Sequence, residues 1–328
     1  MTILITGSAG HLGEALMRTL SAAGRKAFGL DLKPSPYTGM VGSILDRDFV
    51  RHCIKEVDAV VHAATLHKPH VGTHPAQDFV DTNVSGTLIL LEEAVRAGVG
   101  RFVYTSTTSA FGSALRPSPG DPAAWITEEV RSVPKNIYGV TKKAAEDLCE
   151  MFARRGRLAA IILRTARFFP EEDDDALIRS RYETANAQAN ELLYRRADLE
   201  DVASAHLAAL EQATRIGFGR YIISATTPFQ QSDLPLLHRD APSVVRRYYP
   251  EYDALYEARG WTMFPAIDRV YLNRKSVEQL AWRPRYDFRH VLECLRAGRD
   301  FLSPLARAVG EKGYHDRQFA EGPYPVVG

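Results

Sequence analysis

A strand that runs directly into a glycine-rich turn limits the fold more than any other feature of this sequence. Residues 2–6 form a short β-rich run, and Gly7, Gly10 and Gly13 follow it at intervals of three. An apolar stripe with helical spacing begins inside the turn, at Leu12, Ala15, Leu16 and Leu20. The sequence therefore predicts a strand, a tight turn and an amphipathic helix in immediate succession.

The same alternation continues through the first half of the chain. Further β-rich runs occupy residues 26–31, 58–63, 101–106 and 159–164. Long segments with helical spacing run from about Pro75 to Ala97 and from about Tyr138 to Arg155, each followed by a glycine. Because the strands are apolar along their length, their sheet is expected to be buried on both faces. The pattern predicts an α/β fold with a doubly wound parallel sheet of the Rossmann type.

Charge and composition exclude several classes of protein. The 328 residues contain 41 Lys and Arg against 40 Asp and Glu, and a net charge of +1 recruits neither nucleic acid nor an acidic membrane. No apolar run reaches the roughly 20 residues of a membrane helix. Cys53, Cys149 and Cys294 lack metal-ligand spacing and fit a reduced compartment. We expect a cytoplasmic protein that binds a small molecule, with no nucleic acid or membrane partner.

The glycine turn has the chemistry of a phosphate site. Gly7 permits a tight turn, Gly10 lets the backbone approach a pyrophosphate, and Gly13 lets the helix pack closely on the strand. Asp31 ends the second strand, 18 residues after Gly13, where an acid binds the ribose hydroxyls of a dinucleotide. Its charge repels a 2′-phosphate and favours NAD, although the nearby Lys33 keeps NADP as an alternative.

Tyr138 and Lys142 form a candidate acid–base pair. A spacing of four places both side chains on one face of a helix, about 6 Å apart along its axis. The ammonium and the positive ring of NAD⁺ would favour the phenolate, and lowering the pKa of the tyrosine by about three units corresponds to about 4 kcal/mol. The fourth strand ends in five hydroxyl residues, 105–109, at the edge where an open α/β sheet binds its ligand. These features predict oxidation of an alcohol.

Together these motifs resemble the extended short-chain dehydrogenase/reductase superfamily, in its NAD-dependent epimerase/dehydratase branch. The resemblance implies that Thr107 is the catalytic hydroxyl, Tyr138 the base, and Lys142 the residue that orients the ribose. The matching segments are Thr6–Gly13, Asp31, Gly42–Asp46, His62–Ala64, Asn83–Thr87, Thr105–Gly112 and Tyr138–Lys142. The cofactor residues that it implies are Gly7, Gly10, His11, Leu12, Gly13, Asp31, Asp46, Ala63, Ala64, Asn83, Tyr138 and Lys142.

The sequence departs from this branch in two places. Dehydratases carry Asp-Glu after the catalytic threonine, and here Thr108-Ser109 has no carboxyl group to protonate a leaving hydroxyl, so water elimination is disfavoured. Sugar-nucleotide epimerases carry an asparagine after the fifth strand, and here Arg167 replaces it. The substrate-side candidates are His67, Thr108, Arg167, Arg195 and Arg196. A basic stretch at Arg239, Arg246 and Arg247 is interpreted either as a phosphate clamp or as solvated surface.

Two further clusters, one of histidines and one of acidic residues, contain residue types that can bind a cation. His67, His70 and His74 have i, i+3 and i+7 spacing, but Pro69 and Gly72 argue against a regular helix there. A histidine that contacts substrate is favoured over a metal ligand. The acidic run 171–175 is interpreted as a solvated loop. No metal is therefore expected.

The second half of the chain is interpreted as a small subdomain woven into the first. We expect residues 1–165 with about 197–226 to form the NAD-binding domain. Residues of about 166–196 with 227–313 would bind substrate, and residues 314–328 would form an arm or tail. The resemblance also implies a homodimer through the helices of residues 75–97 and 138–155.

The favoured hypothesis is an NAD-dependent oxidoreductase or 4-epimerase that acts on a secondary hydroxyl of a sugar or sugar nucleotide through a keto intermediate. The alternatives are a dehydrogenase of a free sugar or sugar acid that releases NADH, and a dinucleotide-sensing regulator without turnover.

Overall fold

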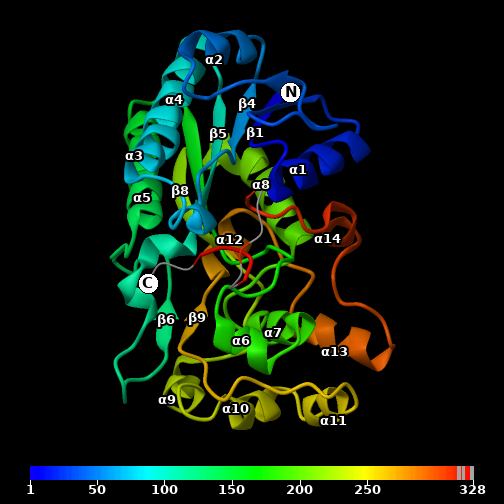
Figure 1. Cartoon of the computed structure of the whole chain (residues 1–328). Coiled ribbons are helices and arrows are strands. Elements are labelled where there is room, and N and C mark those ends of the chain that lie inside the picture. Colours follow the sequence, from blue (N-terminus) through cyan, green and yellow to red (C-terminus); the bar gives the residue numbers. More distant parts are fainter. Residues whose placement is uncertain (316–318, 320–321, 326–328) are drawn as a thin grey trace.

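Seven parallel strands form the centre of the molecule in the computed structural model, which describes residues 1–315, 319 and 322–325. The strand order is β3-β2-β1-β4-β5-β7-β8 (Figure 1). Their bounds are Ile3–Thr6 for β1, Ala27–Asp31 for β2, Met40–Val41 for β3, Ala59–His62 for β4, Arg101–Thr107 for β5, Ala159–Thr165 for β7 and Phe218–Ile223 for β8. The predicted α/β class and doubly wound parallel sheet are confirmed.

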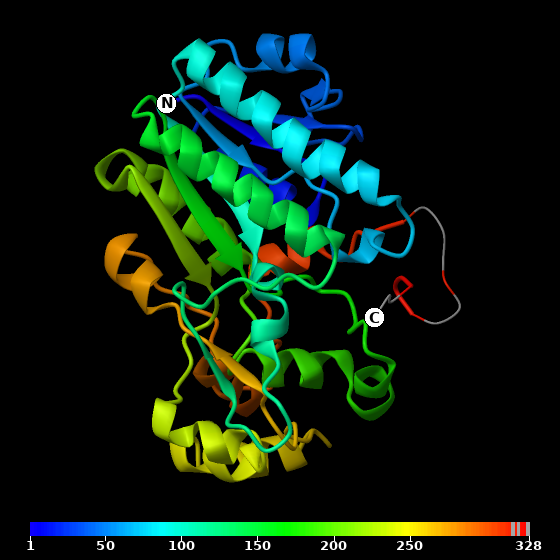
Figure 2. The ribbon, with the colours of Figure 1, turned by 90° about the vertical axis from the view of Figure 1, so that its left-hand side faces the viewer.

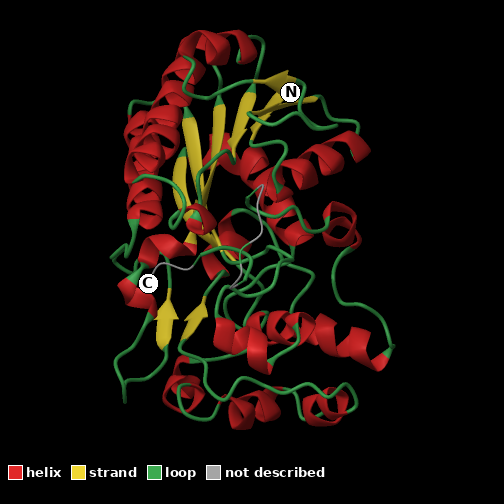
Figure 3. Ribbon diagram, in the orientation of Figure 1, coloured by secondary structure: helices red, strands yellow, loops and turns green. Residues whose placement is uncertain are grey.

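Helices cover both faces of this sheet, as expected for strands that are apolar on both sides (Figure 3). On one face α1 (His11–Ala22) and α8 (Leu199–Ile216) pack together with α14 (Pro304–Val309). On the other face lie α2 (Arg47–Cys53), α4 (Gly86–Ala97) and α5 (Ile137–Arg154), of which α4 and α5 run side by side in Figure 2. Alternate residues of β1 belong to the two apolar clusters, with Ile3 and Ile5 towards α1 and Leu4 towards α4.

The helix predicted from Pro75 to Ala97 is present, with an unpredicted change of pitch. It is continuous through α3 (Ala76–Phe79), a π-helical segment η2 (Val80–Ser85) and α4. Pro75 precedes its first turn, and Gly98 ends it in a left-handed conformation with φ of 75°. Segments of π-helix are frequently found at functional sites, and this one carries Asn83.

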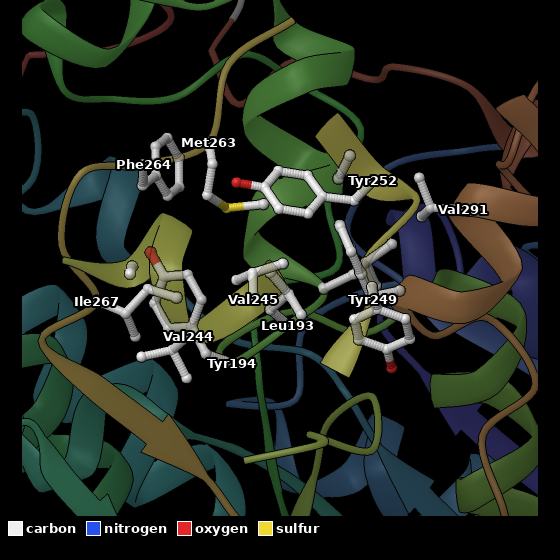
Figure 4. Close-up of a cluster of buried hydrophobic side chains, with 14 of the residues drawn as sticks. Leu193, Tyr194, Val244, Val245, Tyr249, Tyr252, Met263, Phe264, Ile267 and Val291 are labelled. Carbon is white, nitrogen blue, oxygen red and sulfur yellow. The ribbon is translucent and has the colours of Figure 1, made fainter. Parts of the chain in front are cut away.

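A second, smaller core lies beyond the carboxyl edge of the sheet. Its strands β6 (Ala124–Ile126) and β9 (Arg269–Tyr271) pair in parallel. Aromatic and aliphatic side chains fill it, several of which Figure 4 shows around Leu193 and Tyr252. Its helices are short: α6 (Ala176–Arg181), α7 (Thr184–Glu191), α9 (Leu234–Leu237), α10 (Ala241–Tyr248), α11 (Tyr252–Glu257) and α13 (Phe288–Arg296), with α12 (Arg274–Gln279) packed against β8.

The division into an NAD-binding and a substrate-binding unit stays a proposal. Strand β6 belongs by sequence to the first unit and pairs with β9 of the second, and Ala123 beside it is part of the second core. Of the predicted arm, residues 316–318, 320–321 and 326–328 lie outside the described part of the chain. Within the described residues, no helix is long and apolar enough to cross a membrane.

Close packing of the glycine turn predicts a large effect of one methyl group. A Cβ at Gly13 would lie 1.9 Å from the carbonyl oxygen of Gly7, whereas a Cβ at Gly100 meets nothing within 4 Å. Gly13→Ala is expected to lower the free energy of unfolding by about 3 kcal/mol, measured by urea denaturation. The control, Gly100→Ala, should change it by less than about 0.5 kcal/mol. Equal stabilities of the two variants would contradict this packing.

Candidate active site

The predicted site residues come from loops that meet at the carboxyl edge of the sheet. Strands β1, β4 and β5 lie side by side in one register, with Thr6 opposite His62 and His62 opposite Tyr104. The glycine turn follows β1, and Thr107 ends β5. Ligands of open α/β sheets bind at this edge, so the structure brings the two predicted motifs to one place.

The glycine turn forms a cradle made of backbone. Gly7 has a φ of 76°, and a Cβ there would lie 2.7 Å from the amide nitrogen of Ala64 and 2.9 Å from the carbonyl carbon of Ala63. Gly10 precedes the first turn of α1 and caps it without a side chain, which leaves the first-turn amides for an anion. Any side chain at Gly7 would collide with the backbone that follows β4. The turn therefore fits a dinucleotide pyrophosphate.

The two predicted acids also hold the local backbone. The Asp31 carboxylate accepts hydrogen bonds from the amides of Ala9 and Lys33, both at 2.9 Å, and so links the end of β2 to the glycine turn. Asp46 caps α2 by accepting from the amides of Asp48 at 3.1 Å and Phe49 at 3.0 Å. The Asp31 side chain therefore lies beside the turn, where the sequence predicts the ribose.

Asn83 ties the loop after β4 to the helix that carries the tyrosine. Its Oδ1 accepts from the Leu66 amide at 2.9 Å, and its Nδ2 donates to the Leu66 carbonyl at 2.9 Å and to Thr141 Oγ1 at 3.1 Å. The side chain is buried within the π-helical segment η2. The structure therefore places Asn83 where it fixes α5 relative to the end of β4.

The first two turns of α5 present Tyr138 and Lys142 to the end of β5. Tyr138 is 8% exposed and Lys142 is 1% exposed. The Thr107 hydroxyl hydrogen-bonds to Tyr138. Lys142 Nζ donates to the Thr105 carbonyl at 2.6 Å and lies 4.1 Å from the centre of the Tyr104 ring. The three predicted catalytic residues are thus adjacent in the fold.

Burial decides the protonation of this pair in the chain by itself. Burial raises the pKa of Tyr138 to about 12, against a smaller lowering by its hydrogen bond to Thr107. Burial also lowers the pKa of Lys142 to about 7, although the Glu146 carboxylate opposes it. The sequence predicts a lowered tyrosine pKa beside both the ammonium and the positive ring of NAD⁺, and for that complex it stays a prediction. In the chain by itself, desolvation of the phenolate outweighs the effects of neighbouring groups.

Glu146, which the sequence analysis missed, lies one turn beyond Lys142 on the same face. Its Oε1 accepts from Ser106 Oγ at 2.6 Å and from Arg164 Nε at 3.0 Å, and its Oε2 accepts from Arg164 Nη2 at 2.7 Å. All three side chains are buried. The i+4 spacing of Tyr138, Lys142 and Glu146 was the available signal.

The substrate-side candidates divide into two groups. Thr108 begins a 3₁₀ turn directly after Thr107, and His67 is half-buried with its ring stacked on Phe169 at 5.5 Å. Burial and neighbouring imidazoles hold the pKa of His67 well below its usual range. No group of His, Cys, Asp or Glu within the described residues has the arrangement of a metal site.

The expectation of a solvated loop at residues 171–175 is only partly right, because of its five acids only Glu172 and Asp175 are exposed. Glu171 and Asp173 are buried. Glu171 Oε1 lies 2.6 Å from His11 Nε2, beside the glycine turn, and the Glu171 carboxylate accepts from the hydroxyl of Tyr314. Counter-charges distant in the sequence allow these carboxylates to be buried. Leu12, also predicted at the cofactor, is buried in the apolar cluster beneath α1.

The remaining predicted residues, Arg167, Arg195 and Arg196, are brought together by adjacent backbone segments. The Arg167 amide donates to the Arg195 carbonyl at 3.3 Å, and residues 167 and 196 form a parallel bridge. Their guanidinium groups face carboxylates of the acidic run and of α7. The structure therefore brings the three arginines together and pairs them with carboxylates of the same chain.

Residues 3–223 match the NAD dependent epimerase/dehydratase family. A curated relative, the uncharacterized protein y4nG of Sinorhizobium fredii, is 33% identical over 169 residues, which cover 50% of this chain and only 40% of that protein. A dTDP-glucose 4,6-dehydratase of Mycobacterium tuberculosis is 27% identical over 348 aligned positions, covering 97% of this chain and 99% of the dehydratase. The crystal structure of a short-chain dehydrogenase/reductase superfamily protein from Agrobacterium tumefaciens with bound NAD is 25% identical, with a TM-score of 0.62, and covers 91% of this chain and 98% of its own.

The lowered pKa of Lys142 predicts a pH dependence of stability. Between the folded pKa of about 7 and the unfolded value of about 10.4, the unfolded chain binds more protons, so stability rises with pH in this window. Wild type is expected to gain about 1 kcal/mol per pH unit between pH 7 and 10 relative to Lys142→Met. Urea denaturation of both proteins at several pH values measures this difference. A difference that does not change with pH would show that the buried amine stays charged.

Proposed function

The chain belongs to the NAD dependent epimerase/dehydratase family, and we propose that it oxidises a secondary hydroxyl of a sugar or sugar nucleotide. The cofactor is NAD, as the description of the family states. In the proposed reaction the sugar passes through a keto intermediate, as in a 4-epimerase. The relatives include both epimerases and dehydratases. Support for this specific reaction therefore comes from the residues of the site.

One observation carries the proposal: Thr107, Tyr138 and Lys142 meet at the sheet edge that also holds the glycine turn. Thr107 ends β5, and the other two lie one turn apart at the start of α5. A hydroxyl, a phenol and an amine in this arrangement are suited to proton transfer from an alcohol. The cradle at Gly7, with the Asp31 charge beside it, fits a dinucleotide at the same edge.

Each residue has a defined role in this proposal. Bound NAD⁺ supplies the hydride acceptor. Thr107 Oγ1 holds the oxygen of the substrate, and the Tyr138 oxygen takes the hydroxyl proton as the carbon–hydrogen bond breaks. Lys142 supplies the ammonium that stabilises the phenolate. Gly7, Gly10, His11, Leu12 and Gly13 hold the pyrophosphate, Asp31 the ribose and Asp46 the adenine, while Ala63, Ala64 and Asn83 shape the floor of the site.

The fate of the hydride separates the two leading candidates. An epimerase returns it to the opposite face of the keto intermediate and accumulates no NADH. A dehydrogenase of a free sugar or sugar acid releases NADH with the oxidised product. A dinucleotide sensor without turnover is the third candidate, and the presence of both Tyr138 and Lys142 argues against it.

The proposed reaction does not include elimination of water. The full-length similarity to a dTDP-glucose 4,6-dehydratase does not support it. The argument comes from Thr108 and Ser109, which follow Thr107 and have no carboxyl group to protonate a leaving hydroxyl. Without such an acid at this position, loss of hydroxide from the keto intermediate is slow.

Replacing the tyrosine tests the chemical step. Tyr138→Phe removes the proton acceptor and is expected to lower turnover at least about 100-fold, while the affinity for NAD stays within about twofold. Turnover is measured over a panel of free sugars and sugar nucleotides, both as NADH absorbance at 340 nm and as isomer formation. The control, Tyr252→Phe, changes a buried tyrosine of α11 and should retain activity. Full activity of Tyr138→Phe would eliminate the proposal.

We also propose that the protein is a homodimer through α4 and α5. Three apolar side chains are exposed on this side, with Val140 49%, Met151 37% and Val80 36% exposed. Covering them in a partner's equivalent helices would stabilise the pair. Sedimentation at micromolar concentration is expected to show a dimer, and Val140→Glu should shift it towards monomer. Wild type that sediments only as a monomer would contradict the proposed interface.

A further inference from the structure

Four positive side chains lie around the carboxyl end of β5, on the side where the substrate would bind. Arg167 follows β7, and Lys68 follows β4, so that β5 with Thr107 lies between them. Arg195 and Arg196 follow α7 and lie beside Arg167 through their backbones. A cluster of this kind would be the natural place for the diphosphate of a sugar nucleotide.

A buried carboxylate already occupies the centre of this cluster. Glu191, 1% exposed, lies between the arginines, with its Oε1 2.6 Å from Arg195 Nη2 and its Oε2 2.8 Å from Arg196 Nη1. Arg167 Nη1 lies 3.8 Å from the same carboxylate. Although burial alone would raise it, these guanidinium groups hold the pKa of Glu191 well below its usual range. The carboxylate is therefore charged and saturates the inner side of the cluster.

The acidic run occupies the other side. Asp173 Oδ2 lies 2.5 Å from Arg167 Nη1 and 3.5 Å from Arg195 Nη2, and Asp173 itself is buried. Asp174 pairs with Lys68, a contact that crosses the end of β5 from the loop after β7 to the loop after β4. Each of the four cations thus has at least one carboxylate partner.

The total charge of this region is not positive. Its buried or half-buried carboxylates are Glu171, Asp173, Asp174 and Glu191, against four cations, so the formal charge is zero. The four cations are Lys68, Arg167, Arg195 and Arg196. A diphosphate would bring about two more negative charges beside buried carboxylates, where repulsion is screened less than in water.

The other basic stretch is remote from this edge. Arg246 and Arg247 lie on α10, at the end of the second core that is farthest from the sheet (Figure 1). Arg246 Nε is 2.5 Å from Asp253 Oδ2, and Arg247 Nη1 is 3.8 Å from Asp233 Oδ1. These residues are paired surface arginines and do not replace the cluster as a phosphate clamp.

We propose that the internal pairing of Lys68, Arg167, Arg195 and Arg196 excludes a nucleotide diphosphate, and that the substrate is a free, unphosphorylated sugar or sugar derivative. That the substrate is a sugar rests on the proposed function, whereas the exclusion of a diphosphate rests on the charge cluster alone. Neutral hydroxyl groups of Thr107, Thr108 and Ser109 match the hydroxyls of such a substrate.

The test measures binding of UDP to the NAD-saturated protein by calorimetry. Wild type is expected to bind UDP more weakly than about 1 mM. Asp173→Asn/Asp174→Asn removes two negative charges with little change of shape and should strengthen UDP binding at least tenfold. The control, Glu172→Gln, changes a half-exposed carboxylate of the same run that lies 3.7 Å from Arg179 and is expected to bind UDP as wild type does. If the double variant does not fold, the single variant Asp174→Asn is used in its place, because it frees Lys68 from its carboxylate partner.

Two results would overturn the inference. One is wild type that binds UDP with a Kd below about 10 μM. The other is a folded aspartate variant whose affinity for UDP equals that of Glu172→Gln. Failure of the proposed function is recognised separately, because UDP binding is measured without turnover. A protein that oxidises no sugar but also rejects UDP would remove the oxidoreductase proposal and leave the charge cluster explained.

Discussion

A buried ion pair holds the helix of Tyr138 and Lys142 onto the sheet. Glu146 extends from α5, Arg164 from β7 and Ser106 from β5, so one carboxylate joins three elements. Breaking such a pair by removing one partner costs about 3–5 kcal/mol, because it leaves a buried charge uncompensated. The distance between the tyrosine and Thr107 is fixed by this contact, since Thr107 is the next residue after Ser106. The geometry of the candidate site therefore depends on a contact that lies behind it.

The acidic run at the carboxyl edge of the sheet is also held by ion pairs between buried carboxylates and cations, but these pairs line the ligand side of the site. Lys68, Arg167 and Arg195 neutralise Asp173 and Asp174 and so allow their burial. The buried Glu171 extends to His11 at the start of α1. The pair behind the helix positions the candidate catalytic group, whereas the network in front determines which charges a ligand meets at this edge. Under the proposed exclusion of a diphosphate, specificity would be set by side chains that need not touch the reacting carbon.

The sequence was sufficient where a pattern is local. Spacing alone predicted β1, the glycine turn and α1, because three glycines and one apolar stripe define a βα unit. It failed where the cause lies far along the chain: Asp174 pairs with Lys68, 106 residues away, so the burial of the acidic run has no local signal. The short helices α9 to α11 span only four to eight residues, too few for a clear period. Burial of Tyr138 depends on the whole fold. The direction in which its pKa shifts therefore has no local signal in the sequence.

The pKa values of Tyr138 and Lys142 together show which protonation state of the pair is favoured. With Tyr138 at about 12 and Lys142 at about 7, the neutral phenol and neutral amine are favoured over the phenolate and ammonium. The gap of about five units corresponds to roughly 7 kcal/mol for moving the proton from tyrosine to lysine. Both arrangements carry the same number of protons, so the pH of the solution does not choose between them. A positive charge placed beside the phenol does, because it stabilises the phenolate in a site where burial weakens screening. Under the proposed function, the oxidised nicotinamide has that charge and the reduced one does not. In that proposal, binding of the oxidised cofactor would both supply the hydride acceptor and favour the ionised form of the base.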